Sequence, residues 1–243
     1  MKNLFFLFFF LLSATVFSQP LQDTVVDIDG NVYHTVKIGS QIWMVENLNV
    51  AHYRTGDPVP VMTNDSLWSE LTTAAYCNYS NYPPNSNIYG KLYNFYAVSS
   101  KKNIAPTGWH VPSEEEWQTL ERTLGMSKEQ TDSFGSRGTT EGGQLKEKDT
   151  IHWKGINVGA TNSSGFTALP AGARDYNGKF ISLGTSGCWW TSTPEKNSVY
   201  QPEYSEKSQL WGFYRGVCNS KNKIIKYLGN RQEGFSVRCI KDN

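Results

Sequence analysis

The chain has 243 residues and carries 23 basic against 22 acidic side chains, a formal net charge of +1. A chain this close to neutral has no long-range field to gather nucleic acid, so no nucleic-acid partner is expected. Charged residues make up only 19% and aromatic residues 14%. This balance favours a loop-rich fold with an aromatic core over a disordered chain.

The N-terminus has the pattern of a secretory signal peptide, predicted to span residues 1–18. A single early cation, Lys2, precedes an apolar run at residues 4–12, and cleavage is expected near Ser18-Gln19. The alternative is a membrane anchor, but the run is well short of the ~20 residues a spanning helix needs. No second apolar stretch approaches that length, so no integral membrane span is expected. The mature protein is therefore predicted to be secreted, periplasmic or on the cell surface.

The first half of the chain predicts strands followed by irregular structure. Residues 24–48 alternate apolar and polar side chains between turn signals, which indicates a meander of three short strands. Residues 50–84 are rich in proline and asparagine and are predicted to be irregular. Tyrosines and a leucine at helical spacing predict a first helix over residues 89–98.

The segment GWHVPSEEEW, residues 108–117, allows two interpretations: an active site with carboxylates beside a histidine, or the start of a helix. Ser113 and Glu116 match the S-x-x-E capping box, in which each residue satisfies a backbone amide of the other. Trp117 then opens an apolar stripe of helical spacing, and Gly125 stands where a helix commonly ends. The structural interpretation is favoured: Ser113, Glu116 and Trp117 begin a helix and are not catalytic residues.

The second half of the chain predicts strands again. A glycine-rich region reaches residue 143 and allows short helical turns at most. An Asn-Gly turn within residues 173–180 predicts a hairpin. Further strands are expected at residues 188–193, 210–217, 223–228 and 234–240. Strands, two helices, a long irregular region and more strands together indicate one α+β domain.

Four cysteines follow the signal peptide: Cys77, Cys188, Cys218 and Cys239. An even number in an oxidising compartment predicts two disulfides, although three pairings are open from the sequence. A zinc site is the alternative, but the chain lacks the close Cys and His spacings that such sites use. No metal or cofactor is expected.

Six blocks in order resemble the Fibrobacter succinogenes major paralogous domain. The resemblance covers residues 24–242 and implies a secreted or surface protein of a Bacteroidetes-type bacterium, with no established activity. Two of the blocks are also similar to the sulfatase-modifying, formylglycine-generating enzymes. That similarity implies a C-type-lectin-like, sulfatase-modifying-factor-like core of short antiparallel strands with two main helices and long irregular loops. The blocks are QIWMVENLN (41–49), YGKLYNFYAV (89–98), APTGWHVPSEEEWQTL (105–120), GFTALPAGARDYNGKF (165–180), WWTST (189–193) and GFSVRCIKD (234–242).

The spacing of the cysteines differs from that in the formylglycine-generating enzymes. The formylglycine-generating enzymes hold copper with two cysteines a few residues apart, whereas Cys188 stands alone and Cys218 follows thirty residues later. No catalytic residue is therefore assigned. The resemblance to a lectin-like core implies instead a nested pair of disulfides, Cys77–Cys239 and Cys188–Cys218.

Two classes of function are open. The first is a non-catalytic binding or adhesion module for a glycan, a polysaccharide or a surface protein, and the second is a secreted enzyme of unrecognised type. The triplet Gln201-Pro202-Glu203 resembles one found in sugar-binding lectins, with a plain polar loop as the alternative. Aromatic rings at loop positions could bind ligand or fill the core. The candidate ligand loop comprises Tyr200, Gln201, Glu203 and Tyr204, and the other candidate rings are Tyr79, Tyr82 and Tyr214. The sequence predicts no oligomeric state.

Overall fold

The computed structural model describes residues 23–195 and 211–242 and confirms an α+β fold built mainly of antiparallel strands. The predicted signal peptide and the candidate ligand loop at residues 200–204 lie outside the described residues. The strands are β1 (Thr24–Val26), β2 (Val32–Ile38), β3 (Gln41–Met44), β4 (Tyr76–Cys77), β5 (Leu92–Tyr93), β6 (Trp109–His110), β7 (Gly135–Arg137), β8 (Ala171–Arg174), β9 (Phe180–Leu183), β10 (Ser186–Glu195), β11 (Trp211–Cys218), β12 (Ile224–Gly229) and β13 (Ile240–Lys241). The helices are α1 (Asp65–Ser69), α2 (Pro84–Tyr89), α3 (Phe95–Val98), α4 (Glu114–Thr123), α5 (Lys128–Asp132) and α6 (Glu141–Leu145), with a 3-10 turn η1 (Tyr79–Asn81).

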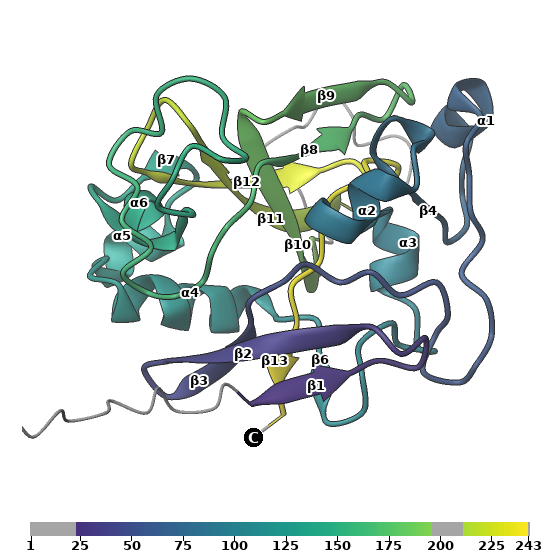
Figure 1. Cartoon of the computed structure of the whole chain (residues 1–243), viewed down its shortest axis with the longest axis horizontal. Helices are drawn as coiled ribbons and strands as arrows, with labels where there is room; N and C mark the ends of the chain where they lie inside the picture. Colours follow the sequence, from purple (N-terminus) through teal and green to yellow (C-terminus); the bar gives the residue numbers. More distant parts are fainter. Residues whose placement is uncertain (1–22, 196–210, 243) are drawn as a thin grey trace, which may run out of the picture.

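The predicted meander forms one side of the first sheet, whose strand order is β1-β2-β3-β13-β6 (Figure 1). Strand β13, from the end of the chain, inserts between β3 and β6 and pairs with both. Ile240 lies opposite Trp43 on one side and His110 on the other. The C-terminus is thereby fixed beside the segment that leads into α4.

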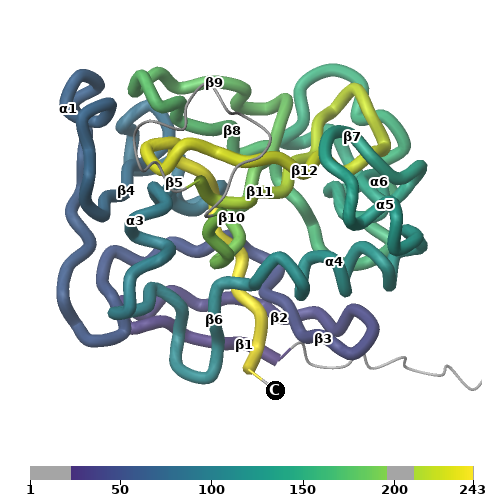
Figure 2. The backbone as a smooth tube through the Cα atoms, turned by 180° about the vertical axis from the view of Figure 1, so that it is seen from behind, coloured from purple at the N-terminus to yellow at the C-terminus, as the bar shows by residue number. Residues whose placement is uncertain are grey.

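The second sheet has the order β7-β12-β11-β10-β8-β9. The predicted hairpin and the predicted strands at 188–193, 210–217 and 223–228 are all present in it. Helix α4 lies between the two larger sheets in both views (Figures 1 and 2). Aromatic rings connect the layers there: Trp117 of α4 lies 5.0 Å from Trp43 and 5.8 Å from Phe166, measured between ring centroids. Phe166 in turn lies 5.9 Å from Trp189 of β10.

The helix predicted at residues 89–98 is wrong. Tyr89 ends α2, and Gly90 follows with a φ of +72°, a conformation that L side chains rarely adopt. A Cβ at Gly90 would lie 2.8 Å from the carbonyl oxygen of Leu48, so the close approach of another loop also requires glycine. The chain then forms β5, and Asn94 caps the short helix α3 by accepting a hydrogen bond from the Ala97 amide. Tertiary contacts thus override the helical spacing of the side chains.

Two further differences from the predicted elements concern strands. The strand expected at residues 234–240 is regular only at β13, and the residues before it make isolated bridges. Phe235 bridges to Tyr93 and Ser236 to Trp189, so this segment connects three parts of the fold instead of following one strand. Strand β7 lies in the glycine-rich region, where no strand was expected. None of the helices in the described ranges combines the length with the apolar composition of a membrane span.

Candidate functional site

The GWHVPSEEEW segment forms the N-terminus of α4, as predicted. The Ser113 side chain accepts a hydrogen bond from the Glu116 amide, and the Glu116 carboxylate accepts one from the Ser113 amide at 2.7 Å. At the other end, Gly125 has a φ of +120° and its amide donates to the Arg122 carbonyl. Trp117 is fully buried. The predicted cap and the predicted core tryptophan are therefore both present.

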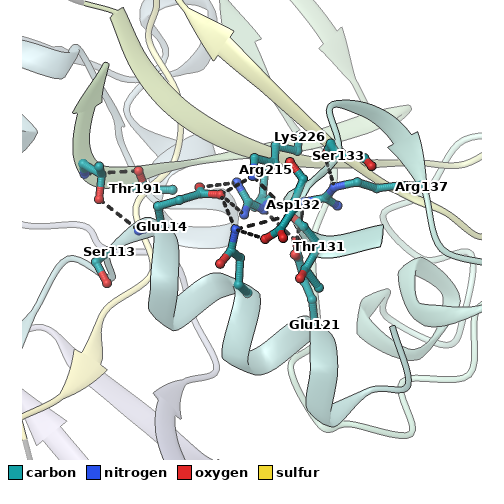
Figure 3. Close-up of polar contacts among 12 residues, drawn as sticks. Ser113, Glu114, Glu121, Thr131, Asp132, Ser133, Arg137, Thr191, Arg215 and Lys226 are labelled. Atoms are coloured by element: carbon teal, nitrogen blue, oxygen red, sulfur yellow. Dashed lines mark hydrogen bonds and ion pairs between the residues drawn. The ribbon is translucent and has the colours of Figure 1, made fainter. Parts of the chain in front are cut away.

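The first and second turns of α4 supply two carboxylates to a buried group that we call the α4 ion cluster, shown in Figure 3. Arg215 of β11 donates two hydrogen bonds to Glu114, at 2.8 and 2.9 Å, and a third to Glu121 at 2.6 Å. Arg137 of β7 makes two hydrogen bonds to Glu121. Lys226 of β12 lies 2.6 Å from Glu114. The cluster is Glu114, Glu121, Arg137, Arg215 and Lys226.

The pKa values of Arg215 and Glu114 are both shifted in the direction that favours the charged form. Burial alone would lower the pKa of Arg215, but Glu121 and Glu114 outweigh burial and raise it. Burial alone would raise the pKa of Glu114, but hydrogen bonds and charge from Arg215 and Lys226 lower it. A carboxylate held ionised by two cations is poorly suited to proton transfer near neutral pH. The cluster therefore connects α4 to the second sheet.

The histidine of the same segment is also used structurally. His110 lies between two carboxylates, with Nε2 at 2.7 Å from Glu116 and Nδ1 at 2.6 Å from Asp242. The hydrogen bond with Glu116 is the main reason that the pKa of His110 is raised, with burial opposing it and Asp242 adding to it. The imidazole thereby links the cap of α4 to the last residues of the chain.

Another buried cation, Arg174, lies at the opposite end of the molecule. We call the region around it the Arg174 corner, which comprises residues 62–69, η1 with Tyr82, and the β8–β9 hairpin. Arg174 is fully buried and donates hydrogen bonds to the carbonyls of Gly178 and Met62, at 2.9 and 2.7 Å. It also pairs with Asp65 at 2.5 Å. Its guanidinium lies 4.3 Å from the Trp68 ring centroid. One side chain thus joins its own hairpin to residues 62–69, and η1 is joined to that segment by the Asn81 side chain, which donates to the Thr63 carbonyl at 2.7 Å.

The outer surface of the Arg174 corner carries exposed apolar side chains. Tyr82 is 59% exposed and Tyr176, in the hairpin turn, is 51% exposed. Leu67 and Ile181 are also exposed there. Of the rings proposed from the sequence as ligand contacts, Tyr82 is the exposed one among the described residues. Tyr79 packs against Phe180, and Tyr214 packs against Phe235 and Trp190.

A hollow of about 270 Å³ lies beside the edge strand β1. Its polar side chains are already engaged: Arg54 donates to the carbonyls of Ala105, Pro106 and Trp109, and the Asp27 carboxylate accepts from Tyr33. The remaining walls are mainly aliphatic. This hollow therefore offers few groups that could orient a polar ligand.

Glu233 is a titratable residue that the sequence did not single out. Burial raises its pKa to about 7. Burial is the main reason that the pKa values of the Cys188 thiol and the Tyr214 phenol are raised. The negative charge of Glu233 raises both pKa values further. A partly buried carboxyl near a thiol and a phenol is a feature of some catalytic sites. No motif marks Glu233, which lies in a turn, so sequence reasoning missed it.

All four cysteines are free in the structure, so neither predicted disulfide, Cys77–Cys239 nor Cys188–Cys218, is formed in it. Cys77 is buried with Trp68 and Leu92, whereas Cys239 belongs to a different hydrophobic cluster. Cys188 lies opposite Gly216 in the β10–β11 pair and Cys218 lies opposite Ser186. The two cysteines are therefore diagonal neighbours, and such neighbours are about 7–8 Å apart, beyond the usual span of a disulfide.

No group of three His, Cys, Asp or Glu side chains within residues 23–195 and 211–242 could hold a metal ion. Among the buried charged residues of the described ranges, six are cations and three are acids, and the sequence motifs did not identify the cations. Arg174 and Arg238 both lie in blocks that carried the family resemblance, which was the one available signal.

A family model described as the Fibrobacter succinogenes major domain matches residues 36–241. No curated protein and no solved structure matches the chain.

Proposed function

The chain belongs to the Fibrobacter succinogenes major domain family, and we propose that it is a non-catalytic module that binds a glycan, a polysaccharide or a surface protein through the Arg174 corner. The proposal includes export to the periplasm, the cell surface or the medium after cleavage near Ser18-Gln19. It also includes the finer fold assignment, a C-type-lectin-like core that presents loops to a ligand.

The observation that carries the proposal is a pair of exposed aromatic side chains on loops that are hydrogen-bonded to the same segment, residues 62–69. Tyr82 and Tyr176 both expose more than half of their surface. Aromatic rings stack on the apolar faces of sugars and anchor protein interfaces. Arg174 holds the hairpin of Tyr176 against residues 62–69, and Asn81, next to Tyr82, donates to the Thr63 carbonyl of that segment, so binding requires little ordering of the backbone.

The chemistry of the α4 segment supports a binding role over a catalytic one. Glu114 is committed to the ion cluster and Glu116 to the cap and to His110. These carboxylates were the main candidates for acid–base catalysis in the sequence, and each has a structural partner.

A glycan array probed with the mature protein, followed by affinity measurements on the best ligand, tests the proposal. Tyr82→Ala and Tyr176→Ala should each weaken binding about tenfold, the effect of losing roughly 1.4 kcal/mol of stacking. Tyr227→Ala is the matched control, since Tyr227 is 50% exposed on β12, outside the corner. Equal losses in all three variants, or none in the first two, would contradict the assignment of the surface.

A secreted enzyme is the second candidate, and Glu233 is the observation that favours it. A carboxyl with a pKa of about 7 could exchange protons near neutral pH. Incubating the mature protein with a mixed panel of glycans and peptides would detect product, and Glu233→Gln should abolish any turnover. Turnover that requires Glu233 would favour the enzyme over the binding module.

A further inference from the structure

The α4 ion cluster is not balanced in charge. The cluster contains three cations and two carboxylates, so one positive charge is in excess. Arg137 is 5% exposed and uses Nε on the Ser133 carbonyl and Nη2 on Glu121. Its Nη1 is buried and has no hydrogen-bond partner. Buried donors without a partner are rare in native proteins, and each indicates a water, an ion or a functional role.

Arg137 is one of the residues that line a hollow of about 310 Å³. The residues that line the hollow include a second cation, Lys223, and Gln130. Among the described residues, no carboxylate forms an ion pair with Lys223. The hollow also includes one carboxylate, Glu129. The volume is about ten times that of a single water molecule and is sufficient for a sulfate, a phosphate or a carboxylate with part of the molecule that carries it.

We propose that this hollow, lined by Arg137, Lys223, Gln130, Ser133 and Gly138, binds an oxyanion. Arginine recognises such groups through two N–H donors in a fixed plane, and lysine adds a point charge. An oxyanion here would supply the missing acceptor for Arg137 and offset the excess charge of the α4 ion cluster. Two sources share this chemistry: a free inorganic ion, and a sulfate or carboxylate group on an acidic polysaccharide. The site is separate from the Arg174 corner and does not depend on the proposed function of that surface.

The test is an NMR titration of the mature protein with sodium sulfate, with sodium chloride adjusted to keep the ionic strength constant. The amides of Gly138 and Lys223 should shift and saturate. Lys223→Ala should weaken the affinity about three- to fivefold, the scale of one exposed charge interaction. Lys101→Ala, which removes an exposed lysine on the loop between α3 and β6, should leave it unchanged.

Arg137→Ala could unfold the protein because Glu121 would lose a partner, so Arg137→Lys is the second variant. It keeps the charge, and its circular dichroism spectrum reports whether it folds. Folded Arg137→Lys should bind sulfate more weakly than the wild type. Shifts that rise linearly without saturation, or equal affinity in the wild type, Lys223→Ala and Arg137→Lys, would overturn the proposal.

The source of the oxyanion is decided by a second titration, with a sulfated oligosaccharide and its unsulfated counterpart. Tighter binding of the sulfated sugar than of free sulfate, with shifts at the same amides, identifies an acidic polysaccharide. Equal or weaker binding identifies the free ion. Shifts at those amides with the neutral sugar alone would contradict an oxyanion site.

Discussion

Two fully buried arginines, Arg215 and Arg238, are held in opposite ways. Arg215 contacts the carboxylates of Glu114 and Glu121, and these raise its pKa. Arg238 donates to the Asn47 side chain and to the Phe166 carbonyl, and burial lowers its pKa to about 9. Its guanidinium lies 4.3 Å from the Phe166 ring centroid. The charge of Arg215 is therefore balanced by carboxylates, whereas the charge of Arg238 is stabilised by neutral oxygen acceptors and an aromatic ring.

Arg215 and Arg238 therefore stabilise their surroundings in different ways. Even the lowered pKa of Arg238 lies above neutral, so both arginines are charged at pH 7. Removal of the Arg238 side chain would take a donor only from neutral acceptors, the Asn47 side-chain oxygen and the Phe166 carbonyl. Around Arg215, removal leaves buried carboxylates that must find another partner. The two sites therefore differ most in the consequence of losing the cation.

The largest expected effect is on the charge-balanced site. Arg215→Met should lower the free energy of unfolding by about 3–5 kcal/mol, because Glu114 and Glu121 keep fewer cations in a buried place. Urea denaturation at pH 7 measures it. A loss under about 1 kcal/mol would mean that water reaches these carboxylates.

Arg238→Met should cost less, about 1–3 kcal/mol, the scale of leaving neutral hydrogen-bond acceptors without a donor. Asn47 keeps one donor, the Trp189 indole, at 2.8 Å. The same denaturation experiment applies. A cost larger than that of Arg215→Met would reverse the ranking and refute the comparison.

The cap of α4 gives a smaller effect. Ser113→Ala should cost about 1 kcal/mol, because the Glu116 amide loses its acceptor. Ser127→Ala is the matched control, since Ser127 caps the shorter helix α5 with the same type of capping box. The first residue of α5, Lys128, is not part of the α4 ion cluster. We expect the two variants to cost similar amounts of stability. Only Ser113→Ala should weaken the contact between Glu114 and Arg215.

The smallest effect is a pH dependence from His110. Its pKa is raised in the folded protein, so its stabilising contribution is complete below its ordinary value of 6.5 and is lost as pH rises through the folded value. Since a third of this side chain is exposed, the contribution should stay below about 1 kcal/mol. Comparing wild type with His110→Gln from pH 6 to 8 isolates it from the other three histidines. Parallel pH profiles would show that His110 does not contribute.

Local signals in the sequence were sufficient for α4, for the meander and for the β8–β9 hairpin. In each of these, capping or turn residues fix the element without distant partners. The helix expected at residues 89–98 failed because Gly90 and the pairing of β5 with β4 depend on contacts with remote segments. Strand β7 was missed because three residues, Gly135–Arg137, carry no alternation that a pattern could reveal.

The burial and the contacts of the interior cations could not be predicted from the sequence either. Lys146 is buried, and its Nζ donates to three carbonyls, those of Val158, Cys218 and Lys221. A lone lysine in a sequence is normally a surface residue, and nothing local shows that three loops converge on it. The sequence predicted that Glu114 and Glu116 lie in the first turn of a helix, as they do, but it could not name the partners of Glu114 on β11 and β12.

A double-mutant cycle between Arg215→Met and Glu121→Gln tests most directly whether the α4 carboxylates are structural. The free energies of unfolding of the wild type, both single variants and the double variant are measured in urea at pH 7. We predict a coupling energy of at least about 1.5 kcal/mol, since each group is buried and each depends on the other. A coupling below about 0.5 kcal/mol would show that the pair does not act as a unit and would contradict the structural role of the α4 ion cluster.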